Sequence, residues 1–219
     1  DKGDYAKAVE QENLARNLVE VLYPNDNHKK GKELRLKQQY FFVSASVQRA
    51  VARYKKHHDD LHKLYEKVAI QLNDTHPTVA VAELMRILMD EYHYDWDHAW
   101  YIVNNTFAYT NHTVMPEALE KWDIKFIRIV IPHLLPIIRQ LQEVETAEFE
   151  KCAVDEKSRE RMAIIANKQV NMANMAVFVS KKTNGVAAIH TEILKDIVLK
   201  EWYKLYPDRF VNKTNGITQ

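Results

Sequence analysis

The 219-residue sequence predicts an α/β fold that is rich in helix. Two short apolar runs, 68–72 and 107–110, are each bounded by turn residues, which is typical of buried strands. Segments with apolar residues at helical spacing precede, separate and follow these runs. Strands that alternate with helices form α/β sheets, and ligands bind at the carboxyl ends of such strands. The polar residues that follow each run are therefore candidates for a binding site.

The helical segments carry apolar residues that recur every three or four positions. We expect helices over 5–21, 34–54, 79–89, 96–103 and 187–200, and one that begins near Pro116. The stretch 124–141 is strongly apolar, but Pro132 and Pro136 predict that it forms short or bent helices. The run 170–179 fits either a strand or a buried helix.

Three other segments are polar. Residues 24–27 form a turn that ends the first helix, and 146–161 is charged and expected at the surface. The stretch 55–62 contains four residues able to bind a metal ion: His57, His58, Asp59 and His62. A solvated connection is the favoured interpretation of this stretch, so we assign no metal ligand.

Composition argues against several classes of protein. The formal net charge of +1 gives no strong field that would draw the chain to nucleic acid or to an anionic membrane. The sequence has no apolar run of about 18 residues and no signal-peptide pattern, which argues against a spanning or secreted chain. A single cysteine, Cys152, fits a reducing compartment, so we expect a cytoplasmic protein.

Glycine is scarce, and its positions exclude a phosphate-binding loop. Such a loop needs closely spaced glycines so that backbone N–H groups reach the anion, whereas the four glycines here are scattered. We therefore assign no cofactor-binding residue. The first residue is not methionine and the last residues are a polar run, which suggests a segment of a longer protein.

The candidate site residues are amides, carboxylates and histidines near turns and strand ends. They are Asp26, Asn27, Asp74, His76, His112 and Asn184. Taken singly, each has a structural interpretation, because Asn and Asp favour turns and caps and a histidine is often an ordinary buried side chain. Together they suit a sugar, whose hydroxyls each need a hydrogen-bond partner when buried. No nucleophile–base pair is evident, because Cys152 lies in a charged stretch and the serines form no elbow motif.

Five blocks of sequence, in order along the chain, resemble those of the α-glucan (glycogen, starch or maltodextrin) phosphorylases. The first is VLYPNDN with GKELRLKQQY, followed by VAIQLNDTHP and FAYTNHTVMPEALE. The last two are NGVAAIH and NKTNGIT. This resemblance covers nearly the whole chain.

The resemblance implies a two-domain (GT-B type) glycosyltransferase built from Rossmann-like domains. Residues 1–219 would be the latter part of the N-terminal domain, and the C-terminal cofactor domain would lie outside the chain. The family cleaves α-1,4-glucan ends with inorganic phosphate to give glucose 1-phosphate. It uses pyridoxal 5'-phosphate, whose lysine is not in this sequence, and a homodimer is one expected assembly. Neither nucleic acid nor membrane is expected as a partner.

The resemblance also implies roles for the candidate residues. Asn27 matches a residue that bonds a glucose hydroxyl, and Asp26 is its neighbour on a loop that gates the site. His112 and Asn184 match the pair that holds the glucose 6-hydroxyl. The backbone carbonyl of His112 would face the anomeric carbon, where positive charge develops, which makes it the catalytic candidate. Asp74 and His76 would line the pocket beside the sugar.

Several segments depart from the family pattern. The sequence drifts over 123–168, which we expect to be peripheral and rapidly cleaved by proteases, and 179–183 differs just before Asn184. Met172-Ala-Asn174 lacks the family's histidine, and Ala52-Arg53 lacks the paired arginines of nucleotide-activated enzymes. We expect this chain alone to be inactive and unable to bind the cofactor covalently. The alternative is a non-catalytic carbohydrate-binding or interaction module derived from such an enzyme.

Overall fold

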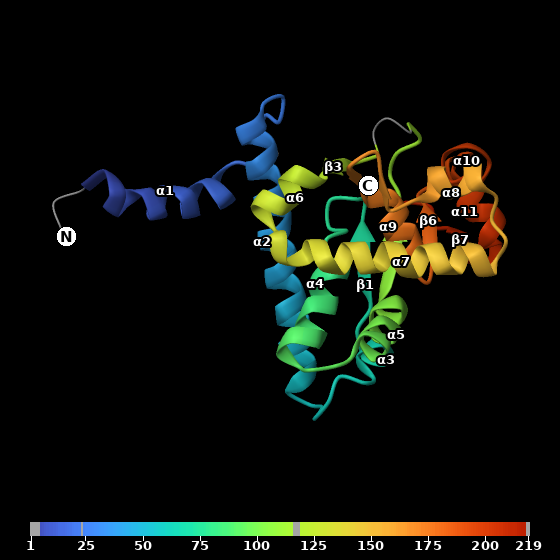
Figure 1. Cartoon of the computed structure of the whole chain (residues 1–219), viewed down its shortest axis with the longest axis horizontal. Coiled ribbons are helices and arrows are strands. Elements are labelled where there is room, and N and C mark those ends of the chain that lie inside the picture. The colour runs from blue at the N-terminus through green and yellow to red at the C-terminus, as the bar shows by residue number, and fades with distance from the viewer. Residues whose placement is uncertain (1–4, 23, 116–118, 218–219) are drawn as a thin grey trace.

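The computed structural model describes residues 5–22, 24–115 and 119–217, with side chains from residue 9 onward in the first helix. Figure 1 shows helices packed around a small sheet, with α1 (Tyr5–Glu20) reaching away from this body. A second, antiparallel sheet lies beside α6 (Ile124–Val130). The predicted helix-rich α/β class is confirmed.

The main sheet is parallel and has the order β1-β2-β6-β7. Its strands are β1 (Ile70–Asn73), β2 (Phe107–Thr110), β6 (Thr183–Gly185) and β7 (Phe210–Asn212). Asn73 pairs with Thr110, and Thr110 with Asn184, so the carboxyl ends lie along one edge. The two predicted strands are confirmed. Residues 184–185 belong to β6 and do not form a turn.

The N-terminal helices follow the predicted positions. The second helix, α2 (Lys29–Lys55), begins five residues earlier than predicted because His28 caps it, and His28 Nδ1 accepts the N–H of Gly31 at 3.0 Å. After the one-turn α3 (Leu64–Lys67), α4 (Ala80–Arg86) continues into a π-helical turn, Ile87–Glu91. Asp95 caps α5 (Trp96–Thr106) by accepting the N–H of His98.

Of the two prolines expected to interrupt the helix over 124–141, only Pro132 does so. Pro132 ends α6 (Ile124–Val130) and opens a 3-10 turn, whereas Pro136 lies in the first turn of α7 (Leu135–Lys151), where its missing N–H costs no helical bond. The segment 187–200 contains α10 (Ala188–Ile193) and a π-helical turn, and α11 (Lys200–Leu205) follows. The remaining helices are α8 (Glu156–Met162) and α9 (Met172–Val179).

The small antiparallel sheet was not predicted. It has the order β3-β5-β4, with strands β3 (Lys121–Asp123), β5 (Gln169–Asn171) and β4 (Ile165–Ala166). Residues 116–118, where a helix was expected to begin, lie outside the described residues, and the strand that follows shows that this helix does not continue. The run 170–179 is divided, because its first two residues end β5 and the rest form the buried helix α9.

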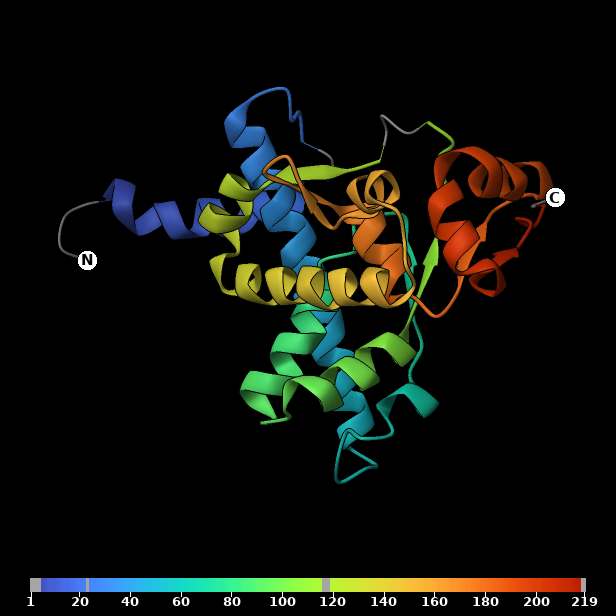
Figure 2. The same cartoon turned by 45° about the vertical axis from the view of Figure 1, so that its right-hand side comes forward.

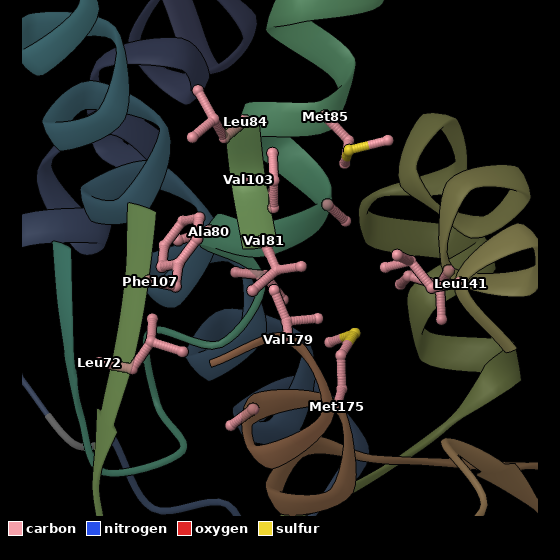
Figure 3. Close-up of a cluster of buried hydrophobic side chains, with 14 of the residues drawn as sticks. Leu72, Ala80, Val81, Leu84, Met85, Val103, Phe107, Leu141, Met175 and Val179 are labelled. Atoms are coloured by element: carbon pink, nitrogen blue, oxygen red, sulfur yellow. The ribbon is translucent and has the colours of Figure 1, made fainter. Parts of the chain in front are cut away.

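The core lies between the sheet, α4, α9 and α7, as Figure 3 shows with Leu72, Leu84, Leu141 and Val179. Helix α7 crosses the body in Figure 2 and packs on α4. Ile127, Leu134, Ile138 and Leu141 are all fully buried. The expectation that 123–168 is peripheral is therefore wrong, because apolar faces of α6 and α7 complete the core. The charged part of this segment, 146–161, is mostly exposed as predicted.

Candidate functional site

The carboxyl edge of the parallel sheet carries a hydrogen-bonded row of polar side chains. Gln71 Nε2 donates to Thr110 Oγ1 at 2.8 Å and to Asn184 Oδ1 at 3.3 Å. Thr110 Oγ1 donates to Asn184 Oδ1 at 2.9 Å. We call Gln71, Thr110 and Asn184, one each from β1, β2 and β6, the sheet-edge row. The three side chains are uncharged, and each has hydrogen-bond donors or acceptors that suit the hydroxyls of a sugar.

His112 lies next to this row on the loop after β2, and its side chain is exposed. Its Nε2 hydrogen-bonds to Asn73 Oδ1 at the end of β1. Because an amide oxygen only accepts, Nε2 is the donor, and Nδ1 is the ring atom left to face a ligand. The structure thus brings His112 and Asn184 to the same edge of the sheet, at the ends of the adjacent strands β2 and β6.

Asp74 turns the chain at the end of β1. Its φ of 67° is left-handed, a conformation that Asp adopts more readily than most residues. Its N–H donates to Thr110 O at 2.8 Å, and its carboxylate accepts the N–H of Thr75 at 2.6 Å. Burial, with a smaller contribution from the Asp74 charge, raises the pKa of Tyr109 well above its usual range. Asp74 therefore lies at the sheet edge, but it serves the turn.

Asn111 is a residue of the site that was not among the candidates chosen from the sequence. It is fully buried, and its N–H donates to Asn184 O at 3.0 Å. Its side chain donates to Tyr109 Oη and accepts the N–H of Thr113, each at 2.9 Å. Asn111 thus fixes the start of the loop that carries His112. Asn111 is marked out by its burial, which the sequence does not show, because a polar residue after a strand is usually expected to be exposed.

His76 lies in the turn between β1 and α4. It lines a separate hollow against α2, together with Leu22, Arg35, Gln38, Gln39, Phe42, Val43 and Pro77. None of the other candidate residues lines that hollow.

Asp26 and Asn27 lie on the loop that precedes α2. The Asp26 carboxylate accepts from Arg35 Nη1 at 2.6 Å, and Arg35 Nη2 lies 3.4 Å from Glu120 Oε1. Asn27 is exposed, and its N–H donates to Asn25 Oδ1 at 3.0 Å. Asp26 is thus tied to α2, and Asn27 is presented to solvent.

Gly31 packs directly under this loop, since a Cβ at this position would lie 1.9 Å from the backbone oxygen of Asn25. Gly31→Ala is expected to displace the loop and to lower the free energy of unfolding by about 1–3 kcal/mol, as overpacking does. Thermal unfolding and hydrogen exchange over 24–28 would measure both effects. Gly216→Ala is the control, because nothing lies within 4 Å of that position. Equal stability of the two variants would contradict the prediction.

The described part of the chain offers few groups for a metal ion or a cofactor. It contains no group of three His, Cys, Asp or Glu side chains placed to hold a metal ion, and none of its helices is both long and apolar enough to cross a membrane. Every lysine side chain described is exposed or half-buried. The half-buried Lys55 and Lys195 bind Asp59 O and Glu192. A covalent aldehyde cofactor needs a lysine amine enclosed in a pocket, and none of the described lysines is enclosed in this way.

Comparison with known proteins gives the family. The Carbohydrate phosphorylase family matches residues 1–219. Glycogen phosphorylase of Chlamydia trachomatis is 46% identical over 220 residues, which cover 99% of this chain and 27% of the relative. The brain form of glycogen phosphorylase from Rattus norvegicus is 47% identical over 228 residues, with the same coverage. Glycogen phosphorylase 2 of Dictyostelium discoideum is 44% identical and is covered over 22% of its length.

The chain thus spans about a quarter of the length of these curated relatives. The family match, however, extends over the whole of it. The chain belongs to the carbohydrate phosphorylase family.

Proposed function

We propose that the chain is part of an α-glucan phosphorylase, which transfers glucose from α-1,4-glucan ends to inorganic phosphate and releases glucose 1-phosphate. Family membership supports this proposal, and the observation that carries it is the sheet-edge row with His112 beside it. In this arrangement, Asn184 Nδ2 donates to its neighbour's carbonyl, Gly185 O, at 3.1 Å. A sugar hydroxyl can replace that acceptor without leaving a buried group unpaired.

The proposed roles are those that the resemblance to the α-glucan phosphorylases implies for these residues. Asn184 and His112 hold the glucose 6-hydroxyl, and the backbone carbonyl of His112 stabilises positive charge near the anomeric carbon. Asn27 contacts the sugar from its loop, with Asp26 beside it. Asp74 lines the pocket while it turns the chain. His76 contributes only if the hollow against α2 belongs to the same pocket in the complete protein.

The complete protein is proposed to be a GT-B enzyme with a second domain. Pyridoxal phosphate would be bound outside this chain, because the described lysines do not fit it. A homodimer is the proposed assembly, without nucleic acid or membrane partners. The alternative is a non-catalytic carbohydrate-binding module, and a cofactor-lysine block downstream in the gene would decide for the enzyme.

Substitution of His112 tests the proposal in the full-length enzyme. His112→Ala removes a side-chain bond and loosens the aligned carbonyl, which together are worth on the order of 2.7–4 kcal/mol by analogy with oxyanion-hole deletions. We expect kcat/KM to fall by at least about a hundredfold. Asn184→Ala removes one bond to a neutral sugar and should lower kcat/KM about tenfold or less.

A glucosyl acceptor without the 6-hydroxyl separates the two residues. It should abolish the difference between Asn184→Ala and wild type, because the bond in question is already absent. It should leave most of the His112→Ala defect, which arises at the anomeric carbon. Equal defects of both variants on both acceptors would show that neither residue has its proposed role.

A further inference from the structure

The loop that follows β2 begins with a turn built by a buried amide. Asn111 is fully buried, and its Oδ1 accepts the N–H of Thr113, two residues later, at 2.9 Å. This is an Asx turn, in which an asparagine side chain takes the place of a backbone carbonyl. The residue in the middle of the turn is His112. The turn therefore encloses the residue whose carbonyl is the catalytic candidate.

The orientation of the Asn111 amide is fixed by its two partners. Nδ2 donates to Tyr109 Oη at 2.9 Å in a buried contact, and Tyr109 is itself fully buried in β2. If the amide were reversed, its NH2 group would face the N–H of Thr113, and two donors cannot bond to each other. Oδ1 is therefore held towards Thr113. The N–H of Asn111 also extends the β2–β6 ladder, because it donates to the backbone oxygen of Asn184 at 3.0 Å.

The hydrogen bond to Thr113 sets the direction of the His112 carbonyl. That carbonyl and the N–H of Thr113 belong to one planar peptide group, which is trans, because the described chain has no cis peptide bond. In a trans peptide the C=O and the N–H point in opposite directions. Since the N–H points at the Asn111 side chain, the carbonyl points away from it. No backbone N–H of the described residues donates to this carbonyl, so it is able to face a ligand.

The other contacts of this loop do not restrain the same peptide plane. Residues 111–115 form neither helix nor strand, and the His112 side chain is exposed. The bond from His112 to Asn73 Oδ1 is made by the imidazole ring. Thr113 Oγ1 accepts the N–H of Met115 at 3.2 Å, which restrains the residues that follow. Among the described contacts, the bond to Asn111 Oδ1 is thus the one that holds the plane between His112 and Thr113.

We propose that Asn111 is a positioning residue that directs the His112 carbonyl towards the anomeric carbon. Because it is fully buried, Asn111 acts through the peptide plane and not by contact with the sugar. A dipole that is aligned before the reaction stabilises the transition state without a cost of reorganisation. This proposal rests on the proposed role of the His112 carbonyl in the function above, and it involves no side chain of β6.

Two variants that differ by one oxygen provide the test in the full-length enzyme. Asn111→Ala and Asn111→Ser lose the same contact with Tyr109, but the serine hydroxyl can still accept the N–H of Thr113. Asn111→Ala should lower kcat about tenfold, as the loss of one hydrogen bond does, and should change KM less than about twofold, because the carbonyl acts on charge that develops in the transition state. Asn111→Ser should keep kcat within about threefold of wild type. Equal kcat values of the two variants would overturn the proposal.

Hydrogen exchange reports on the turn without any sugar chemistry. The Thr113 amide should exchange slowly in wild type, faster in Asn111→Ser and fastest in Asn111→Ala, because a hydroxyl holds such turns more weakly than an amide. The values of kcat should fall in the same order. Asn111→Asp keeps the shape and an acceptor oxygen, so it should resemble wild type, and it is compared with Asn111→Ser if Asn111→Ala does not fold. An order of kcat that differs from the order of exchange would overturn the role of Asn111.

Asp60→Ala is the control for the loss of a turn as such. Asp60 Oδ1 accepts the N–H of His62, two residues later, at 2.9 Å, in the exposed connection after α2. This variant should accelerate exchange of the His62 amide and leave kcat unchanged. A loss of kcat as large as that of Asn111→Ala would overturn the specific role of Asn111. A failure of the proposed function is recognised differently, as wild-type kinetics of His112→Ala or as a wild-type enzyme that does not phosphorolyse glucan.

Discussion

Glu83→Ala is expected to lower the free energy of unfolding by about 3–5 kcal/mol, because it breaks an ion pair whose carboxylate is completely buried and leaves the half-buried Arg86 with only the exposed Glu91 as a partner. Glu83 lies on α4 and is completely buried. Its two oxygens accept from Arg86 Nε and Nη2 at 2.9 and 3.0 Å. They also accept from Ser44 Oγ at 2.7 Å and Tyr40 Oη at 3.2 Å, both on α2. The carboxylate therefore joins two helices of the core.

Chemical denaturation of the protein would measure this loss, with Glu91→Gln as the control. Glu91 also binds Arg86, at 2.8 Å, but 47% of its side chain is exposed. An exposed pair contributes about 0–1 kcal/mol, so the control should change little. A loss below about 1 kcal/mol in Glu83→Ala would contradict the role given to the network. The hydrogen bond to Glu83 is also the main cause of the raised pKa of Arg86.

The same network explains one limit of the sequence prediction. The helical pattern over 79–89 identified the apolar face of α4 correctly, but a charged residue in a helix is normally expected to face solvent. Glu83 is buried because α2 supplies Ser44 and Tyr40 from about 40 positions earlier in the chain. No local pattern encodes such a partner. His133, which binds Tyr40 Oη at 2.9 Å, was likewise assigned to a peripheral segment.

Strand prediction succeeded where burial was local. The runs at β1 and β2 are apolar and bounded by turns, so both could be found from the sequence. β6 and β7 have three residues each and include polar side chains, and their pairing with neighbouring strands is what makes them strands. The start of α2 illustrates the same point, since it depends on the unexpected cap at His28.

The sequence predicted that the site lies at the carboxyl edge of the sheet, but not which side chains meet there. Asp74 and His112 follow predicted strands, and parallel strands bring their carboxyl ends together. The hollow that His76 lines and the contacts of Asn184 with Thr110 and Gln71 depend on tertiary packing. Asn111 was not selected because nothing in the sequence shows that its side chain is buried between Tyr109 and Thr113. Its partners become evident only once the strands are paired.

A buried carboxyl group on α7 carries the second large prediction. Glu145 is completely buried, and burial raises its pKa from 4.5 to about 8. Its Oε2 accepts the N–H of Ile164 at 3.0 Å, whereas Oε1 has no partner among the described residues. Since the raised pKa belongs to the folded state, the folded protein binds this proton more tightly than the unfolded chain does. The contribution of Glu145 to stability is therefore favourable below about pH 4.5 and is lost progressively as the pH rises to about 8.

Glu145→Gln should remove this loss, because the amide resembles the protonated acid and its oxygen can still accept the N–H of Ile164. We expect the variant to be more stable than wild type at pH 8, by an amount on the order of 4 kcal/mol at about 1.36 kcal/mol per pKa unit. Near pH 4.5 the two proteins should differ little. Urea unfolding across this pH range would measure the difference, with Glu143→Gln, at an exposed position of the same helix, as the control. A pH-independent difference between Glu145→Gln and wild type would mean that Glu145 does not titrate between these limits, and the stabilisation would then need a cause other than its burial.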